Sequence, residues 1–367
     1  MADRLVGQGA CAPGARSGPP PARPERGDLL SVQYLRAIAA LAVLAFHAAQ
    51  RAGGAFPPGA AGVDIFFVIS GFIMWVIAAR RPPSPGVFLA RRAGRIVPLY
   101  WLVTLALAAA YVAAPGLFPN LKPTPAHVLQ SLAFIPHRDP AGVAAPLVIP
   151  GWTLNFEVFF YLVFALALFL PERRRLWALT GGLCLLAALG AVFRPSSVVL
   201  STYTSPLLLE FLAGAWIGKT WSDGYAPPPV QAWGLVGAGA GMFALVTWSG
   251  VDTEPWRLLL WGAPAAMIVA GAVGLERAGQ TPEWKPAKFL GDSSYSLYLA
   301  HGLAISLAAK VCERLGLGSG PVLFLVAVAT GLAAGSACYV LIERPLLRLF
   351  HRRSRPRLTK VPVPAAG

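Results

Sequence analysis

Apolar runs separated by short polar segments recur along most of the chain. Most runs are close to the roughly 20 residues that a helix needs to cross the hydrocarbon core of a bilayer. The pattern therefore predicts an all-α, polytopic integral membrane protein with about ten transmembrane helices. These are expected at about 31–50, 61–79, 96–114, 151–170, 176–193, 199–218, 231–249, 257–275, 289–309 and 320–342.

The two ends of the chain lack this pattern. Residues 1–28 are rich in Pro, Gly, Ala and Arg and carry no apolar run, which predicts a disordered cytoplasmic tail rather than a secretory signal peptide. Residues 347–367 are expected to form a basic cytoplasmic tail. The predicted membrane domain therefore occupies residues 29–346.

The composition agrees with a membrane protein. Hydrophobic residues make up 56% of the chain, charged residues only 13%, and the mean hydropathy is +0.59, a balance that excludes an ordinary soluble globular protein. The four cysteines are scattered without the spacing of a metal site or a disulfide framework. We therefore expect no bound metal.

The net charge of +15 is distributed by topology. If the N-terminus is cytoplasmic, 23 basic residues fall in the inner segments and 7 in the outer ones. By the positive-inside rule, both termini are predicted to be cytoplasmic. The positive charge then needs no nucleic-acid partner to explain it.

The first predicted span carries two ionisable side chains, Arg36 and His47. Such groups are costly inside a membrane and are usually functional. Their separation corresponds to three helical turns plus about 20°, so both lie on nearly one face, about 16 Å apart along the axis. The structural alternative is a snorkelling arginine and a histidine within a helix–helix interface.

Two carboxylates are expected near the outer half of the membrane. Asp64, at the start of the second span, is either an ordinary helix-start residue or a functional one. Glu157 lies about 9 Å below Gly151 in the fourth span. It is expected either to pair with an arginine of another span or to orient and charge-stabilise His47. Trp152 adds a polar edge at the same level.

The segment before the third span contains Arg91, Arg92 and Arg95. Arg92 and Arg95 share one face at an expected helix start, and two guanidiniums beside a helix N-terminus can clamp a phosphate. The alternative is a positive-inside anchor. In the ninth span, Tyr298 and His301 are three residues apart, and either substrate binding or helix–helix hydrogen bonding explains them.

Six elements in order resemble the membrane acyltransferase family 3 across about residues 31–346. They are Arg36 and His47 with ten residues between them, GVDIFFVISGF, RRAGRIVPLYW, GWTLNFEVFFY, SSYSLYLAH and the closing ERP. The amino-acid sequences of the second and fourth elements further resemble the ExoZ-type branch, which O-acetylates bacterial exopolysaccharides. The resemblance implies that the family's arginine and histidine fall on Arg36 and His47, its RxxR pair on Arg92 and Arg95, and its glutamate on Glu157.

This resemblance implies transfer of an acyl group, acetyl first, from cytoplasmic acyl-CoA to a sugar hydroxyl of a cell-surface or exported polysaccharide. Acyl-CoA is expected as a substrate, with no permanently bound cofactor. In this hypothesis His47 is the general base, and Arg36 stabilises negative charge or positions the thioester. Direct transfer and an acyl-histidine relay both stay open.

The remaining candidate residues divide between donor and acceptor. Arg92 and Arg95, with the adjacent Arg91, are expected to bind the CoA headgroup. The acceptor, a polysaccharide or lipid-linked saccharide, is expected to contact Asp64, Trp152, Tyr298 and His301. A transporter or flippase of lipid-linked sugars, in which the same buried charges line a translocation path, is the competing interpretation.

Overall fold

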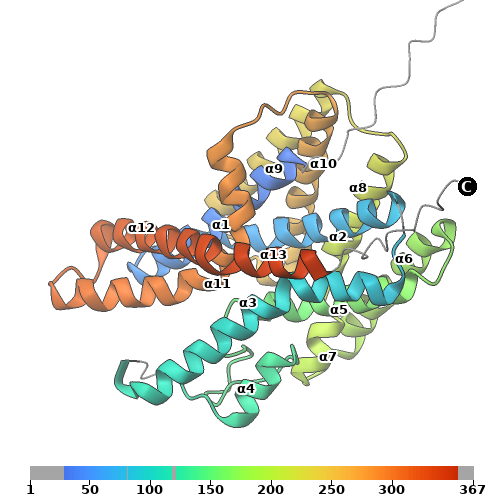
Figure 1. The fold of residues 1–367 in the computed structure, drawn as a ribbon. Coiled ribbons are helices and arrows are strands. Elements are labelled where there is room, and N and C mark those ends of the chain that lie inside the picture. The colour runs from blue at the N-terminus through green and yellow to red at the C-terminus, as the bar shows by residue number, and fades with distance from the viewer. Residues whose placement is uncertain (1–28, 81, 118–120, 354–367) are drawn as a thin grey trace, which may run out of the picture.

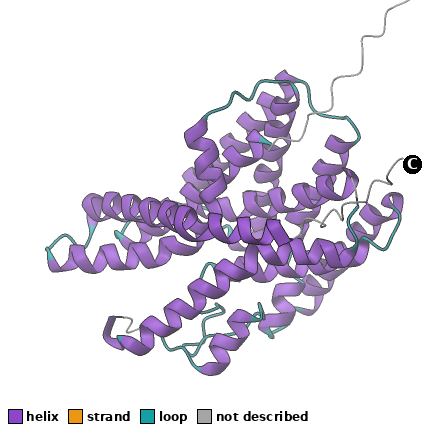
Figure 2. Ribbon diagram, viewed as in Figure 1, coloured by secondary structure: helices purple, strands orange, loops and turns teal. Residues whose placement is uncertain are grey.

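The computed structural model describes residues 29–80, 82–117 and 121–353, and this part of the chain is helical without any strand (Figures 1 and 2). The α-helices are α1 (Leu30–Arg51), α2 (Gly62–Arg80), α3 (Pro85–Ala113), α4 (Pro125–Leu132), α5 (Gly151–Ala167), α6 (Glu172–Phe193), α7 (Val198–Tyr203), α8 (Leu208–Ser222), α9 (Pro229–Ser249), α10 (Ala263–Arg277), α11 (Lys285–Arg314), α12 (Gly320–Cys338) and α13 (Arg344–Arg353). Short π-helical turns, Leu258–Gly262 and Tyr339–Glu343, precede α10 and follow α12. The all-α prediction is confirmed.

Nine helical segments of the described chain are long and apolar enough to cross a membrane. They are Leu30–Arg51, Pro57–Ala79, Pro85–Ala113, Glu172–Phe193, Val198–Ser222, Pro229–Ser249, Leu258–Arg277, Lys285–Arg314 and Gly320–Leu349. The tenth expected span, about 151–170, corresponds to the apolar but shorter α5. Pro150 and Pro171 bound this segment, which explains why the helix does not extend further.

Large apolar side chains cover much of the outer surface of these helices. Val112, Val230 and Trp248 are 79%, 85% and 86% exposed, respectively. Such exposure would be unfavourable in water but is what lipid-facing positions require. Because helices satisfy their backbone hydrogen bonds internally, they can present these faces to hydrocarbon.

α2 lies at the centre of the bundle and packs along α8. A Cβ atom on Gly71 would lie only 1.9 Å from the carbonyl oxygen of Phe211, and one on Gly214 the same distance from the carbonyl oxygen of Val68. The two backbones therefore touch, as expected where small residues replace larger ones in a membrane helix interface. α1 in turn packs along α11, and α11 along α12.

α3 begins earlier than expected, and Arg91, Arg92 and Arg95 lie inside it rather than at its start. Ser84 caps the helix by accepting a hydrogen bond from the Val87 amide, and Pro85 occupies the first turn. Both residues are favoured at helix starts. The arginine pair therefore gains nothing from a helix N-terminus, and that part of the phosphate-clamp prediction is wrong.

The predicted tails fall largely outside the described residues. This holds for all of 1–28 and for 354–367, whereas residues 347–353 continue α13. Between α3 and α5, residues 121–150 form α4 and a folded loop (Figure 1). In this loop Asp139 accepts hydrogen bonds from the amides of Ala141 and Val143, which hold a tight turn.

Candidate active site

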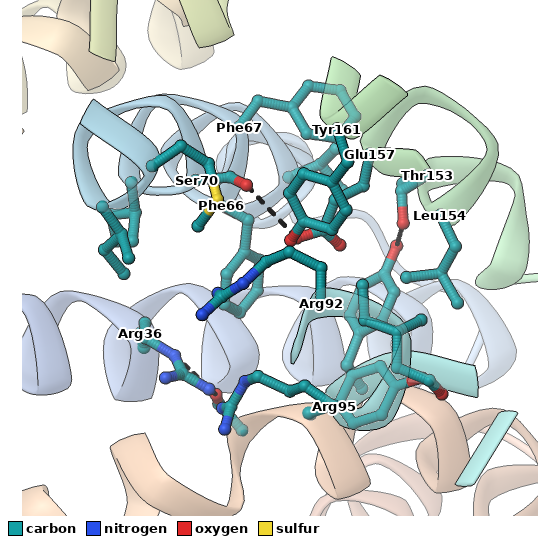
Figure 3. A pocket seen from close by; sticks show the side chains of 18 residues that line it. Arg36, Phe66, Phe67, Ser70, Arg92, Arg95, Thr153, Leu154, Glu157 and Tyr161 are labelled. Carbon is teal, nitrogen blue, oxygen red and sulfur yellow. Dashed lines mark hydrogen bonds between the residues drawn. The ribbon is translucent and has the colours of Figure 1, made fainter. Parts of the chain in front are cut away.

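Three arginines and one glutamate converge on a pocket between α1, α2, α3, α5 and α11 (Figure 3). Arg36, Arg92, Arg95 and Glu157 line it, and its volume is about 110 Å³. Apolar side chains such as Phe66 and Ile73 complete the wall. We call this the arginine pocket. Three guanidiniums against one carboxylate leave the arginine pocket with a positive charge, which suits an anionic ligand.

Arg36 is held in this pocket by α11. Its Nε and Nη2 atoms donate hydrogen bonds to the hydroxyl of Ser294, over 3.2 and 2.9 Å. The guanidinium thus has a fixed position but keeps donors free of this bond, since arginine carries five N–H groups. The helical rise still places Arg36 about 16 Å from His47 along α1.

Arg92 and Arg95 reach the arginine pocket because they are three residues apart on α3 and share its face. Arg91 points elsewhere: it is exposed and does not line the pocket. Arg91 therefore does not join its neighbours in this pocket, and its expected contact with the same ligand stays a prediction. Arg91 and Arg95 are four residues apart and within about 40° of each other around the helix, so the exposure of Arg91 follows from how α3 packs and not from its spacing.

Glu157 lies in the arginine pocket and not beside His47. Its carboxylate accepts hydrogen bonds from the hydroxyls of Ser70, over 3.2 Å, and Tyr161 (Figure 3). Glu157 was expected either to pair with an arginine of another span or to orient His47, and the second arrangement is wrong. The carboxylate instead shares a pocket with the arginines of α1 and α3.

A second pocket, of about 560 Å³, contains His47 and His301. Their rings stack, with centroids 5.2 Å apart. The Nδ1 atom of His301 lies 3.2 Å from the carbonyl oxygen of Leu297. A carbonyl only accepts, so Nδ1 carries the proton when this imidazole is neutral, and the lone pair lies on Nε2. We call this cavity the histidine pocket.

Tyr298 and Val63 line both pockets. The Tyr298 hydroxyl lies 3.1 Å from that of Thr153, and its ring packs edge-on against Phe66. The two pockets therefore meet at this pair of side chains. Tyr298 also contacts His301, with ring centroids 5.9 Å apart.

Asp64 is completely buried and lines none of these cavities. Its two carboxylate oxygens accept hydrogen bonds from Nε and Nη2 of Arg257, over 3.2 and 2.9 Å. Arg257 does line the histidine pocket. The prediction that Asp64 contacts the substrate is wrong, because the carboxylate instead fixes an arginine that faces the pocket.

Glu210 belongs to the same buried cluster. It lies beside Asp64 and packs against Gly262 in the π-helical turn before α10. Two carboxyl groups therefore face one guanidinium. Sequence reasoning assigned Glu210 no role and missed Arg257, whose position at the outer start of a predicted span was the available signal.

Trp152 lines the histidine pocket, as its expected role in acceptor binding requires. In the part of the chain that the structure describes, no group of His, Cys, Asp and Glu side chains is arranged to hold a metal ion. The side chains that line the two pockets offer guanidiniums, imidazoles, hydroxyls and the carboxylates of Glu157 and Glu254.

Comparison with known proteins identifies this arrangement. A family model described as an acyltransferase domain, Acyl_transf_3, matches residues 29–340. The chain is 46% identical over 323 residues to the exopolysaccharide production protein ExoZ of Rhizobium meliloti (strain 1021), which covers 88% of this chain and 98% of the relative.

Two further relatives are more distant. Acyltransferase MdmB of Streptomyces mycarofaciens is 28% identical, over 92% of this chain and 96% of its own. Peptidoglycan O-acetyltransferase OatA of Listeria monocytogenes is 25% identical, over 77% of this chain and 50% of its own. No solved structure gives a significant match. The family model spans α1 to the end of α12, with every pocket residue described above, and the chain therefore belongs to the acyltransferase family 3.

Proposed function

We propose that the protein transfers an acyl group, most simply acetyl, from acyl-CoA to a hydroxyl of a sugar in a cell-surface or exported polysaccharide. The observation that carries this proposal is the contact between the arginine pocket and the histidine pocket at Tyr298 and Val63. One pocket suits a polyanionic donor, and the other offers a base to an acceptor.

The charge of the arginine pocket supports acyl-CoA as the donor. Arg92 and Arg95 would hold phosphates of the CoA headgroup, since guanidiniums bind phosphate oxygens in bidentate fashion. By the positive-inside rule, the end of α3 that carries these arginines faces the cytoplasm, where acyl-CoA is made. The apolar wall then accommodates the pantetheine arm.

Arg36 lies too far along α1 to touch a reacting thioester beside His47, because stabilising an oxyanion requires donors within about 3 Å. Of the two roles expected for it, positioning the donor fits its place between Ser294 and the pocket. Arg257 is better placed to stabilise charge, because it lines the histidine pocket and Asp64 holds its orientation.

The transfer step takes place in the histidine pocket. An acceptor hydroxyl oxygen attacks the thioester carbonyl carbon while His47 accepts the hydroxyl proton. The carbon–sulfur bond then breaks, a carbon–oxygen ester bond remains, and the imidazolium returns its proton to the CoA thiolate. His301, with its Nδ1 proton on the Leu297 carbonyl, turns Nε2 toward the pocket and positions His47 by stacking.

The relatives support a saccharide acceptor. The name of the Rhizobium relative refers to exopolysaccharide production, and that of the Listeria relative to O-acetylation of peptidoglycan. Membership of an acyltransferase family also favours an enzyme over a transporter or flippase of lipid-linked sugars. The many lipid-facing apolar side chains support a multi-pass membrane protein, and the proposed use of cytoplasmic acyl-CoA favours the bacterial inner membrane.

The test uses purified protein in lipid nanodiscs with acetyl-CoA radiolabelled on the acetyl group. The acceptor is polysaccharide of the native host from which the acyl groups have been removed chemically. We expect the labelled acetyl group to become attached to this polysaccharide and an equal amount of free CoA to be released. The proposal fails if neither acetyl-CoA, succinyl-CoA nor a branched acyl-CoA transfers label to any saccharide. Movement of labelled lipid-linked sugar across liposomes without acylation would favour the transporter instead.

A further inference from the structure

A third cavity, of about 260 Å³, lies beside the histidine pocket, between the loop after α4, the first turn of α5 and the short α7. His137, Trp152, Asn155, Ser201, Thr202 and Ser205 provide its polar lining. We call this the loop pocket. Trp152 belongs to both cavities, so its indole forms a wall between them.

The Asn155 amide is the strongest sign that the loop pocket binds a ligand. Asn155 is only 4% exposed, yet its side chain makes no hydrogen bond to any residue of the described chain. Its polar atoms are open to the cavity rather than sealed in the core, so a ligand in the loop pocket can pair with both its N–H donors and its carbonyl oxygen. A ligand that both donates and accepts hydrogen bonds would satisfy it.

The rest of the lining defines the chemistry of that ligand. No Arg, Lys, Asp or Glu side chain lines the loop pocket, in contrast to the arginine pocket. The Thr202 hydroxyl is also free of hydrogen bonds to described residues, whereas the Ser201 hydroxyl donates to the carbonyl of Val198. Amide and hydroxyl groups with an indole beside them match a neutral, polyhydroxylated ring that has an apolar face.

We propose that the loop pocket is a saccharide subsite, which binds the sugar next to the one acylated in the histidine pocket. This inference rests on the proposed function for the order of the two sites. A polymer acceptor with one residue in each cavity would pass Trp152, whose two faces then contact adjacent sugars. The subsite explains how the enzyme selects a position within a repeating unit rather than any exposed hydroxyl.

The experiment compares acceptors that differ only in length. The probes are saccharides of one to eight residues, released by mild acid from deacylated exopolysaccharide of the native host. For the wild-type protein we expect KM to fall between one residue and two or three, as the loop pocket becomes occupied. Saturation-transfer NMR with the same probes measures binding independently of turnover.

Two substitutions remove polar groups from the loop pocket without changing charge. Asn155→Leu, with Asn155→Ser in case the first does not fold, and Thr202→Val should each raise KM for the longer saccharides about three- to tenfold, the loss expected for one neutral hydrogen bond. KM for the single sugar should not change. Thr204→Val is the matched control, because Thr204 lies outside the cavity and its hydroxyl donates to the Leu200 carbonyl over 2.7 Å.

The outcomes separate the subsite from the reaction. Equal loss of affinity for single and longer saccharides, or wild-type KM for all lengths in variants that melt normally, would overturn the subsite. If the wild-type protein acylates nothing but binds longer saccharides in an Asn155-dependent manner, the proposed function fails and the subsite stands. If the wild-type protein acylates saccharides but its affinity for them is the same in the Asn155 and Thr202 variants, the proposed function stands and the subsite fails.

Discussion

The hydroxyls of Tyr298 and Thr153 lie 3.1 Å apart and join α11 to α5 where the arginine and histidine pockets meet. In the proposed reaction, the acylated arm of the donor must pass this point. Tyr298 therefore controls access between the two pockets, and the hydrogen bond to Thr153 fixes where its ring stands.

Enlarging Tyr298 should block the passage without disturbing headgroup binding. For Tyr298→Trp we expect kcat to fall more than about tenfold while KM for acetyl-CoA stays near wild type, because the added volume lies beyond Arg92 and Arg95. Tyr298→Phe should lower the free energy of unfolding by only about 0.5–1.5 kcal/mol, the contribution of one neutral hydrogen bond. A double-mutant cycle with Thr153→Val checks this: adding Tyr298→Phe to Thr153→Val should cause little further loss, because the hydrogen bond is already gone.

The arginine pair gives the second prediction. Arg92→Ala and Arg95→Ala should each raise KM for acyl-CoA, since a hydrogen bond to a charged group contributes about 1.5–3 kcal/mol. That range corresponds to roughly 10- to 150-fold in KM. Lysine at either position should recover only part of the loss, because an ammonium cannot form the bidentate contact.

Arg91→Ala is the internal control for charge. It removes the same positive charge one residue away, but Arg91 is exposed and outside the pocket. KM for acyl-CoA should therefore stay near wild type. If Arg91→Ala raises KM as much as Arg92→Ala, the effect is a general electrostatic one and these residues do not grip the donor.

The buried cluster of Asp64, Glu210 and Arg257 predicts unequal effects of two similar substitutions. Asp64→Asn removes the negative charge and one of the two oxygens that accept from Arg257, and losing one partner of a buried ion pair costs about 3–5 kcal/mol. Glu210→Gln leaves that pair intact and relieves the crowding of two carboxyl groups, so it should be far milder. Thermal unfolding in detergent measures both, and equal destabilisation would contradict the assigned pairing.

Much of this architecture could be predicted from the sequence, and the failures have physical causes. Apolar run length gave the spans because hydrocarbon thickness fixes it. The spacing of Arg92 and Arg95 predicted that they share one face, because the helical period is a property of the local backbone. The Ser84–Pro85 cap is also a local signal, and it marks the start of α3.

The relation between helices could not be predicted in this way. Counting residues from Gly151 placed Glu157 level with His47, but depth along one helix does not give its tilt or offset against another, which packing sets. The bond between Asp64 and Arg257 likewise joins residues 193 apart in the chain. Neither pairing has a signature in spacing or composition.

The folded loop before α5 predicts a pH dependence of local stability. Nδ1 of His127 lies 2.8 Å from Nε2 of His137, and burial, with the nearby His137, lowers the pKa of His127 from 6.5, against the opposing charge of Asp139. The unfolded loop therefore binds more protons than the folded one in mildly acidic solution. Its stability should be complete above about pH 6.5 and decline as the pH falls below that value.

Hydrogen exchange of the loop amides at pH 7.5 and 5.5 measures this effect. Exchange, corrected for its intrinsic pH dependence, should be faster at the lower pH in residues 133–148 and unchanged in α2. His127→Asn should remove most of the difference, because an amide does not titrate. A loop equally protected at both pH values would mean that protonation of His127 does not destabilise the fold of this region.

His47 provides the strictest test of the mechanism. As the general base it should contribute roughly 10²–10⁴-fold to turnover. His47→Gln keeps a hydrogen-bonding side chain of similar size but cannot accept a proton near neutral pH, so it should be nearly as inactive as His47→Ala. Donor binding should persist in both, because the arginine pocket does not include residue 47.

A second experiment incubates the wild-type protein with labelled acetyl-CoA in the absence of an acceptor and then stops the reaction. Direct transfer leaves the protein unlabelled, whereas an acyl-histidine relay labels it. Substantial turnover by a correctly folded His47→Gln protein would leave this imidazole with a packing role against His301 and would refute proton transfer to His47.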